Sequence, residues 1–386
     1  MSQSSDASTP ASDFTLPAYG QRSLGDVVPA VARGLGLGPS IAGQPPSDLV
    51  LPDASAYVVF LVDGLGSELL RRYSHSAPFL SSLVQGGAVG TAGVPSTTAT
   101  SLTSFGTGLV PGTHGLIGYT ARIPGTDRLL NHLSWDDRSV DPVDWQPHPT
   151  AFARLAAAGV HVTVVNKRDF AGSGLTVAAH RGAEFVGADR VGERIAAMVA
   201  AAAHAPSLTY VYDSDLDWTG HKFGVASTPW LQQLAMVDAE AEQMRDALPH
   251  SVRFVIVADH GMVDSALSSR VDVDEVLELR DGVDLVGGEA RFRHLYCSRG
   301  SVDSVVSTWR EVLGERALVL TRDDAVARGW FGDMTSAVAP RVGDVLVACR
   351  DDAAIISTRD FPYEKKLVGL HGSLTPAEML IPILIS

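Results

Sequence analysis

Four segments of this sequence carry aspartate and histidine residues in combinations that bind metal ions. The residues concerned are Asp63, Asp217, His221, Asp259, His260 and His371. Asp217 and His221 lie four positions apart, so one helical turn lets both reach a single cation. Asp259 and His260 directly follow an apolar run, where two such side chains are costly unless they are paired or metal-bound. Each residue alone could equally be a helix cap or a solvated side chain. Together, three aspartates and three histidines suffice for two zinc sites.

The hydroxyl-rich segment PSTTATS, residues 95–101, offers a nucleophile. A turn of this kind that opens a helix directs backbone N–H groups toward an anion. A metal ion can also ionise one of its hydroxyls. In isolation, the same pattern is more typical of serine and threonine capping a helix. Beside the metal-binding residues it describes a phosphoryl-transfer centre, in which two cations about 3.5–4 Å apart clamp the attacking and leaving oxygens.

Short apolar runs predict the strands that place these residues. The runs cover residues 57–62, 160–165, 208–212 and 254–258. Their length and β-branched content suit strands that are buried on both faces. Ligands of such sheets gather beyond the carboxyl ends of the strands, which is where Asp63, Asp217 and Asp259 come.

Helices alternate with these strands. We expect one over residues 189–204 with Asp189 as its N-cap, and one over 229–248 with Thr228 as its N-cap and Pro229 at its first position. Alternating strands and helices predict an α/β fold with a mostly parallel central sheet that is covered on both faces.

Residues 265–365 have a different pattern and predict a small α+β cap inserted into the main domain. Candidate strands lie at 291–298, 317–321, 344–350 and 352–358. The Asp351-Asp352 junction predicts a hairpin between the last two. The expected organisation is a flexible N-terminal tail over 1–20, a catalytic core over 21–264, the cap over 265–365 and a return to the core over 366–386. Thr375 to Glu378 predict a capping box that orients the segment after His371.

Composition narrows the class of protein. The chain has 386 residues, 45% of them hydrophobic, which is enough for a large core without disulfides. Its two cysteines exclude a secreted disulfide framework. A net charge of −14 argues against binding a nucleic-acid polymer or an anionic membrane. The sequence shows neither a secretory signal nor a run of about 18 apolar residues, so we expect a cytoplasmic protein.

Five segments, in this order, resemble the alkaline phosphatase superfamily, and most of all its type I phosphodiesterase/nucleotide pyrophosphatase branch. They are VVFLVDGLG, PSTTATSLTSFGTGLVPGTHGLIGY, DLDWTGHKFG, VIVADHGM and LHGSLTPAEMLIP. The resemblance covers the core from about residue 57 to 386, and the cap is weakly matched. It implies an alkaline-phosphatase-like three-layer sandwich and a metal-dependent hydrolase of phosphoric esters. It also implies two divalent metal ions, with zinc as the expected metal.

The resemblance further implies a role for each site residue. One metal ion would be held by Asp63, Thr98, Asp259 and His260, and the other by Asp217, His221 and His371. Thr98 takes the place of the nucleophile through its nine-residue spacing to Thr107, and Thr97 is the alternative. The implied reaction is a double displacement through a phosphothreonine.

One position departs from the family pattern. Tyr119 stands where nucleotide pyrophosphatases carry an asparagine that helps to bind a phosphate oxygen, and its hydroxyl could donate one hydrogen bond instead. We expect a small phosphorylated substrate. A phosphomonoester or phosphonate hydrolase, a phospho-group transferase and a non-catalytic binding module remain alternatives, and the oligomeric state is open. The complete set of seven ligands argues against the binding module.

Overall fold

The structure of the protein, a computed structural model, describes residues 14–38 and 47–386. The first 13 residues of the expected N-terminal tail lie outside the described residues. From residue 14 on, the chain packs against the core. Phe14 is buried, and the amide of Thr15 donates to the carbonyl of Leu374 at 2.7 Å. The amide of Ala18 donates to Oγ1 of Thr91 at 2.8 Å.

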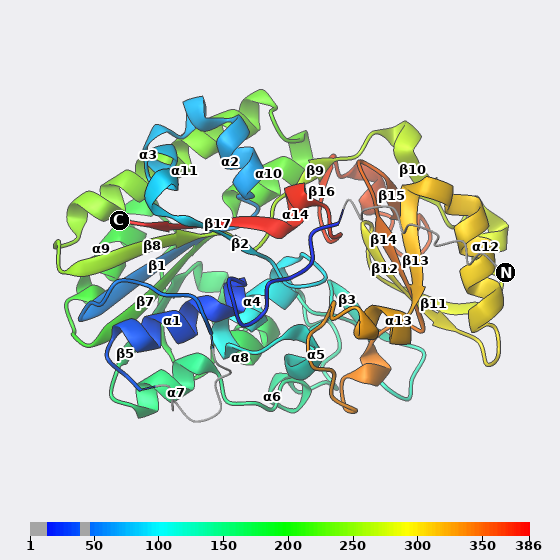
Figure 1. The fold of residues 1–386 in the computed structure, drawn as a ribbon, viewed down its shortest axis with the longest axis horizontal. Coiled ribbons are helices and arrows are strands. Elements are labelled where there is room, and N and C mark those ends of the chain that lie inside the picture. The colour runs from blue at the N-terminus through cyan, green and yellow to red at the C-terminus, as the bar shows by residue number, and fades with distance from the viewer. Residues whose placement is uncertain (1–13, 39–46) are drawn as a thin grey trace, which may run out of the picture.

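A seven-stranded sheet forms the centre of the larger part of the molecule (Figure 1). Its strand order is β2 (Ala88–Thr91), β17 (Leu380–Ile385), β8 (Val252–Val257), β1 (Ala56–Val62), β7 (Ser207–Asp213), β5 (His161–Asn166) and β6 (Glu184–Gly187). Strand β17 runs antiparallel to both of its neighbours, and the pairs from β8 to β6 are parallel. Strand β1 is buried along its whole length, between β8 and β7. These strands confirm the α/β class.

Helices cover both faces of the sheet, which completes a three-layer sandwich (Figure 1). One face carries α1 (Val27–Gly34), α4 (Thr98–Thr107), α7 (Ala151–Ala157) and α8 (Gly174–His180). The other carries α2 (Ser67–Arg72), α3 (Pro78–Ser82), α9 (Val191–Ala202), α10 (Asp215–Phe223) and α11 (Thr228–Ala247). Because both faces are covered, the apolar strand residues bury without alternation. No helix of the described chain is long and apolar enough to cross a bilayer.

Two of the helices begin differently from the expectation. Helix α11 is capped by Ser227, whose Oγ accepts from the amide of Trp230 at 3.3 Å, so Thr228 already belongs to the helix. Helix α9 begins at Val191 without Asp189 as its cap. The Asp189 carboxylate instead accepts from the side chain and amide of Arg168, a long-range partner that local sequence does not reveal.

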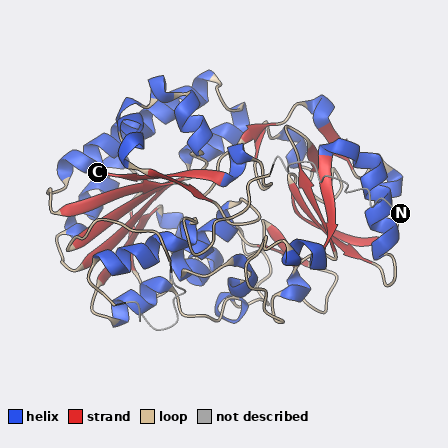
Figure 2. Cartoon of the chain, in the orientation of Figure 1, coloured by secondary structure: helices blue, strands red, loops and turns tan. Residues whose placement is uncertain are grey.

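A second, antiparallel sheet builds the cap region, seen at one end of the molecule in Figure 2. Its order is β11 (Val283–Glu289), β12 (Phe292–Cys297), β14 (Val345–Cys349) and β13 (Ala317–Thr321), with α12 (Val302–Leu313) packed on it. The cap has its own core, which includes Val305, Trp309 and Val347. The expected hairpin at Asp351 is wrong. Strand β15 (Ala354–Ile356) pairs with β10 (Arg270–Asp272), because β12 and β13 already occupy both edges of β14.

The remaining α-helices and strands are short. They are α5 (Pro111–His114), α6 (Pro142–Trp145), α13 (Arg322–Ala327), α14 (Pro376–Met379), β3 (Thr120–Arg122), β4 (Leu129–Asn131), β9 (Val263–Asp264) and β16 (Gly369–Leu370). Strands β9 and β16 pair where the chain leaves the core and where it returns.

A buried ion pair ties the cap to the core. Arg291, just before β12, donates from Nη2 and Nε to the carboxylate of Glu378 in α14, at 2.6 and 3.0 Å. Both side chains are fully buried. The same carboxylate accepts from the amide of Ser373 and the hydroxyl of Thr375. The expected capping box is therefore wrong, because Glu378 bonds to Arg291 rather than back to the amide of Thr375.

Candidate active site

Three adjacent parallel strands bring the three aspartates together. Strands β8, β1 and β7 are neighbours, with Val62 beside Asp213 and Leu61 beside Val257. Asp63 and Asp259 therefore leave the same edge of the sheet, and Asp217 follows β7 in helix α10. The turn after Asp63 needs a glycine. Gly64 has a φ of +75°, and a Cβ at this position would lie 3.1 Å from the Cβ of Asp217.

Asp63, Asp259 and His260 form a buried group that could hold a metal ion. Nε2 of His260 lies 3.4 Å from Oδ1 of Asp63 and 3.4 Å from Oδ2 of Asp259. Thr98, the first residue of helix α4, adds its hydroxyl, with Oγ1 at 3.3 Å from the same nitrogen. These four side chains are those that the resemblance assigns to one metal ion.

Asp217, His221 and His371 form a second group of this kind. Nε2 of His221 lies 3.3 Å from Oδ2 of Asp217 and 3.2 Å from Nε2 of His371. Nε2 of His371 is 3.8 Å from Oδ1 of Asp217. The two groups are neighbours, since the rings of His260 and His371 stack with their centroids 3.7 Å apart.

The three histidines are oriented by backbone carbonyls. Nδ1 of His221 contacts the carbonyl of Gly369 at 2.7 Å, and Nδ1 of His371 contacts that of Ser96 at 2.9 Å. Nδ1 of His260 is 2.9 Å from the carbonyl of Gly261. A carbonyl only accepts, so each Nδ1 carries a proton, and in the neutral imidazole each Nε2 presents a lone pair to its group.

The carboxylate oxygens that face the groups also lack donors. Oδ1 of Asp63, Oδ1 of Asp217 and Oδ2 of Asp259 are buried without a hydrogen-bond partner among the described residues. Burial raises the pKa of Asp63 well above its ordinary value, and the carboxylates of Asp259 and Asp217 add to the shift. Imidazole nitrogens and carboxylate oxygens converge here, and the raised pKa of Asp63 reflects the cost of burying these carboxylates close together. This donor set fits divalent cations.

The neighbouring threonines differ in what they contact. Thr98 points its hydroxyl at His260, whereas Thr97 precedes helix α4 in extended conformation and makes no side-chain cap bond. The hydroxyl of Ser101, one turn further along α4, donates to the carbonyl of Asp259 at 2.8 Å and fixes the helix against the strand end. The hydroxyl of Thr98 thus faces the buried group.

A pocket of about 260 Å³ opens onto the second group and onto Thr98. Its lining includes Thr97, Thr98, Tyr119, Asp217, His221, Glu289, Tyr363 and His371. Tyr119 lies in this lining with its ring against that of Tyr363, at a centroid distance of 6.1 Å. Burial raises the pKa of Tyr363, and the neighbouring Tyr119 hydroxyl adds to the shift.

Sequence reasoning missed three residues of this site. The hydroxyl of Tyr212 donates to Oδ2 of Asp63, and Glu289 and Tyr363 enter the pocket from the cap region. Tyr212 could have been found, because it ends a buried strand beside Asp213. Glu289 and Tyr363 stand in no motif, so only the fold reveals them.

Comparison with known proteins agrees with this geometry. A family model described as type I phosphodiesterase / nucleotide pyrophosphatase matches residues 57–374. Murine ectonucleotide pyrophosphatase/phosphodiesterase 5 has a similar structure, with a TM-score of 0.67, 16% identity, and coverage of 85% of this chain and 87% of that one. Phosphonoacetate hydrolase from Sinorhizobium meliloti 1021, in complex with phosphonoformate, gives a TM-score of 0.65, 16% identity, and coverage of 86% and 90%. A search of curated proteins finds no significant match.

The three-layer fold and the family match together define a hydrolase of the alkaline phosphatase superfamily. Within that superfamily, the chain belongs to the type I phosphodiesterase/nucleotide pyrophosphatase family, whose model spans most of its length. It is a phosphoester hydrolase of this type.

Proposed function

We propose that the protein is a phosphodiesterase that works with two divalent metal ions, expected to be zinc. One ion would be held by Asp63, Thr98, Asp259 and His260, and the other by Asp217, His221 and His371. The observation that carries this proposal is the convergence of imidazole nitrogens and carboxylate oxygens in two adjacent groups, where three of these oxygens are buried without a hydrogen-bond partner among the described residues. When bound, such ions supply Lewis acidity toward a phosphoryl oxygen and lower the pKa of a hydroxyl or water.

The protein's own residues prepare the attack. Thr98 opens helix α4, so its hydroxyl stands where the N–H groups of the first helical turn attract an anion. His260 lies within 3.3 Å of this hydroxyl and contacts the carbonyl of Gly261 through Nδ1, which fixes its ring. Attack of Thr98 on phosphorus would release the first alcohol and leave a phosphothreonine, which water then hydrolyses.

Charge favours a diester over a monoester. Two divalent cations, three aspartates and an ionised Thr98 sum to a formal charge near zero. The described residues that line the pocket include no lysine or arginine. Lys222, the one cation of the motif segments, is exposed and lies over the ring of Trp218 at 4.7 Å. A monoester dianion therefore finds no further positive group for its free oxygens, whereas a diester monoanion needs less compensation.

A substrate panel on metal-loaded protein tests this function. It comprises an aryl phosphodiester, the matching aryl phosphomonoester, a phosphonate monoester and a dinucleotide. We expect kcat/KM to be highest for a diester. Tyr119→Phe should lower the diester rate by about 10-fold if this hydroxyl binds a phosphate oxygen in the transition state. A monoester preference combined with an unaffected Tyr119→Phe would assign the protein to the phosphatase branch. Addition of an alcohol would reveal a transferase through a new ester product.

The substrate is proposed to be a small phosphate ester, of the size that the pocket admits, rather than a nucleic-acid polymer. A nucleotide is one candidate, since a similar structure, an inactive variant of the murine enzyme, is in complex with AMP. That structure shares 15% identity with this chain and has a TM-score of 0.67. The cytoplasmic location and the absence of a membrane partner stay predictions from the sequence.

A further inference from the structure

Glu289 is a buried carboxyl group at the edge of the candidate active site. It ends strand β11 of the cap sheet and is 8% exposed. Neither of its carboxylate oxygens has a hydrogen-bond partner among the described residues. Its Cγ would lie 2.6 Å from a Cβ placed on Gly372, so the side chain packs against the residue that follows His371. Burying a carboxyl group whose oxygens accept no hydrogen bond costs free energy, unless a ligand donates hydrogen bonds to them.

No described residue makes a direct ion pair with Glu289. The guanidinium of Arg293 attracts it, but Arg293 forms its ion pair with Glu364 and donates from Nε to the carbonyl of Ile355. The hydroxyl of Thr97 and the amide of Tyr119 lie alongside and lower its pKa in part. Burial outweighs these effects and raises the pKa of Glu289 to about 8. Arg293 therefore acts on Glu289 through its charge, while its ion pair is formed with Glu364.

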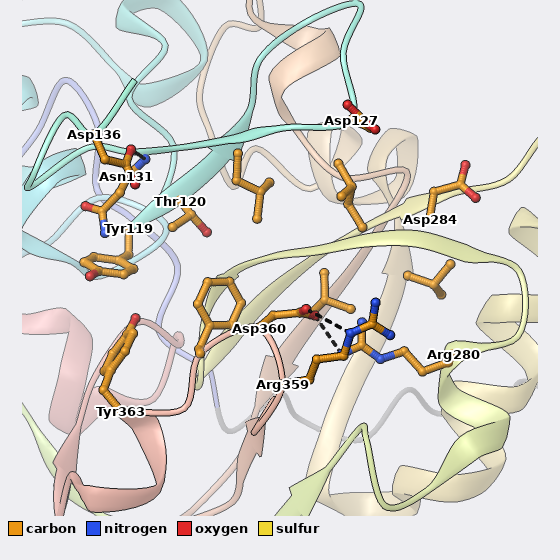
Figure 3. A pocket seen from close by; sticks show the side chains of 15 residues that line it. Tyr119, Thr120, Asp127, Asn131, Asp136, Arg280, Asp284, Arg359, Asp360 and Tyr363 are labelled. Carbon is orange, nitrogen blue, oxygen red and sulfur yellow. Dashed lines mark hydrogen bonds and ion pairs between the residues drawn. The ribbon is translucent and has the colours of Figure 1, made fainter. Parts of the chain in front are cut away.

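The pocket around Glu289 continues into a larger one. Tyr119 and Tyr363 line both the 260 Å³ pocket and a neighbouring pocket of about 620 Å³. Figure 3 shows the two tyrosines at one end of the larger pocket and Asp127 and Asp284 at the other. A substrate held at the metal-binding groups can thus extend past the tyrosine pair into the space between core and cap.

Carboxylates outnumber cations along this path. The larger pocket is lined by Asp127, Asp136, Asp284 and Asp360, and by Arg280 and Arg359. Arg280 is engaged by Asp274 and Asp360, at 2.6 and 2.7 Å. Nε of Arg359 lies 3.9 Å from Asp360 (Figure 3). The net negative charge repels a second phosphate and attracts a positively charged group.

We propose that one ester arm of the substrate carries a primary ammonium group, which Glu289 binds. The inference rests on the proposed phosphodiesterase function and names its substrate class. An ammonium has three N–H donors, so it can satisfy both oxygens of Glu289 in charge-assisted hydrogen bonds. The rings of Tyr119 and Tyr363 offer faces to the same cation or to its alkyl chain.

Pairs of synthetic diesters that differ only in this charge test the inference. Each pair contains a 4-nitrophenyl aminoalkyl phosphate and its alkyl isostere, from 2-aminoethyl against propyl to 4-aminobutyl against pentyl. On metal-loaded wild type we expect at least one amino ester to exceed its isostere in kcat/KM by about 10-fold or more, the scale of a charge-assisted hydrogen bond. Glu289→Gln should remove this preference, so that the two members of each pair are hydrolysed with equal kcat/KM.

A matched control is Glu278→Gln, the same substitution at an exposed cap residue outside both pockets. It should retain the full preference. Equal rates for every amino ester and its isostere in wild type would overturn the inference and leave the phosphodiesterase function intact. So would a Glu289→Gln variant that keeps the preference, or one that loses activity equally on both members of a pair. Hydrolysis of neither member by metal-loaded wild type would instead defeat the proposed function itself.

Discussion

The Nε2 atoms of His221 and His371 lie 3.2 Å apart, although the two residues are 150 positions apart in the chain. Each ring contacts a backbone carbonyl through Nδ1. In the neutral imidazoles, with the proton on Nδ1, neither Nε2 can donate to the other, and two lone pairs face one another beside the carboxylate of Asp217. Such an arrangement is repulsive by itself and becomes favourable with a cation between the acceptors.

Metal content follows from this arrangement. The purified protein should bind about two zinc-like ions per chain, as a dinuclear centre requires. Dialysis against a chelator should abolish diesterase activity, and zinc or manganese should restore it. Metal should also raise the Tm, because it binds the folded state and relieves repulsion among Asp63, Asp217 and Asp259. Elemental analysis and a thermal scan check both effects.

Replacing a single histidine should remove one of the two metal ions. We expect His371→Ala to bind about one ion per chain instead of two. The exposed His204 provides the control, and His204→Ala should keep the full content. Full activity in a protein shown to contain no transition metal would sink the proposal.

Alanine variants of Thr97 and Thr98 should show which of the two adjacent hydroxyls is the nucleophile. Thr98→Ala should lower turnover at least ~10³-fold, because it removes a covalent step rather than a binding contact. Thr98→Ser should keep partial activity. Thr97→Ala should cost little, since the Thr97 side chain makes no cap bond to helix α4. Single-turnover kinetics with an aryl diester measure all three. The opposite ranking of the two alanine variants would move the nucleophile to Thr97.

Tyr212 should tune metal binding through Asp63. Its hydroxyl donates to Oδ2 of Asp63, so Tyr212→Phe leaves that oxygen without its donor. We expect metal affinity to fall by about 10-fold, the usual scale for a residue that orients a ligand. Tyr210 is the matched control, because its hydroxyl is buried on the same strand without a partner among the described residues. Competitive chelator titration should show no loss for Tyr210→Phe, and an equal loss in both variants would refute this role of Tyr212.

The buried ion pair of Arg291 and Glu378 should contribute much of the free energy that holds the cap region against the core. Glu378→Ala leaves the Arg291 guanidinium buried without its counter-charge, which should lower the free energy of unfolding by about 3 kcal/mol or more. Glu68→Ala breaks the exposed pair with Arg71 and should cost under about 1 kcal/mol. Denaturant titration compares the two variants. Similar small losses in both would show that the buried pair is dispensable.

Much of the fold was predictable because its signals are local. Strands such as the one over Tyr57 to Val62 are buried on both faces, so they are apolar at every position and can be recognised in the sequence. Parallel strands end at one edge of a sheet, so the aspartates after them could be expected near one another. The N-caps of the helices were harder to predict. Asp189 has the residue type of a cap, yet Arg168 from another element takes its carboxylate.

By itself, the sequence determined the α/β class and the candidate metal-binding residues, with Asp63 and Asp259 directly after buried strands, because residue type and local periodicity set these properties. Only the tertiary structure decided which long-range partners meet. Strand β15 pairs with β10, because β12 and β13 occupy both edges of β14. The carboxylate of Glu378 forms an ion pair with Arg291 instead of capping its own helix. Glu289 reaches the site from the cap for the same reason: contacts across the fold depend on the packing of whole elements, which no local pattern records.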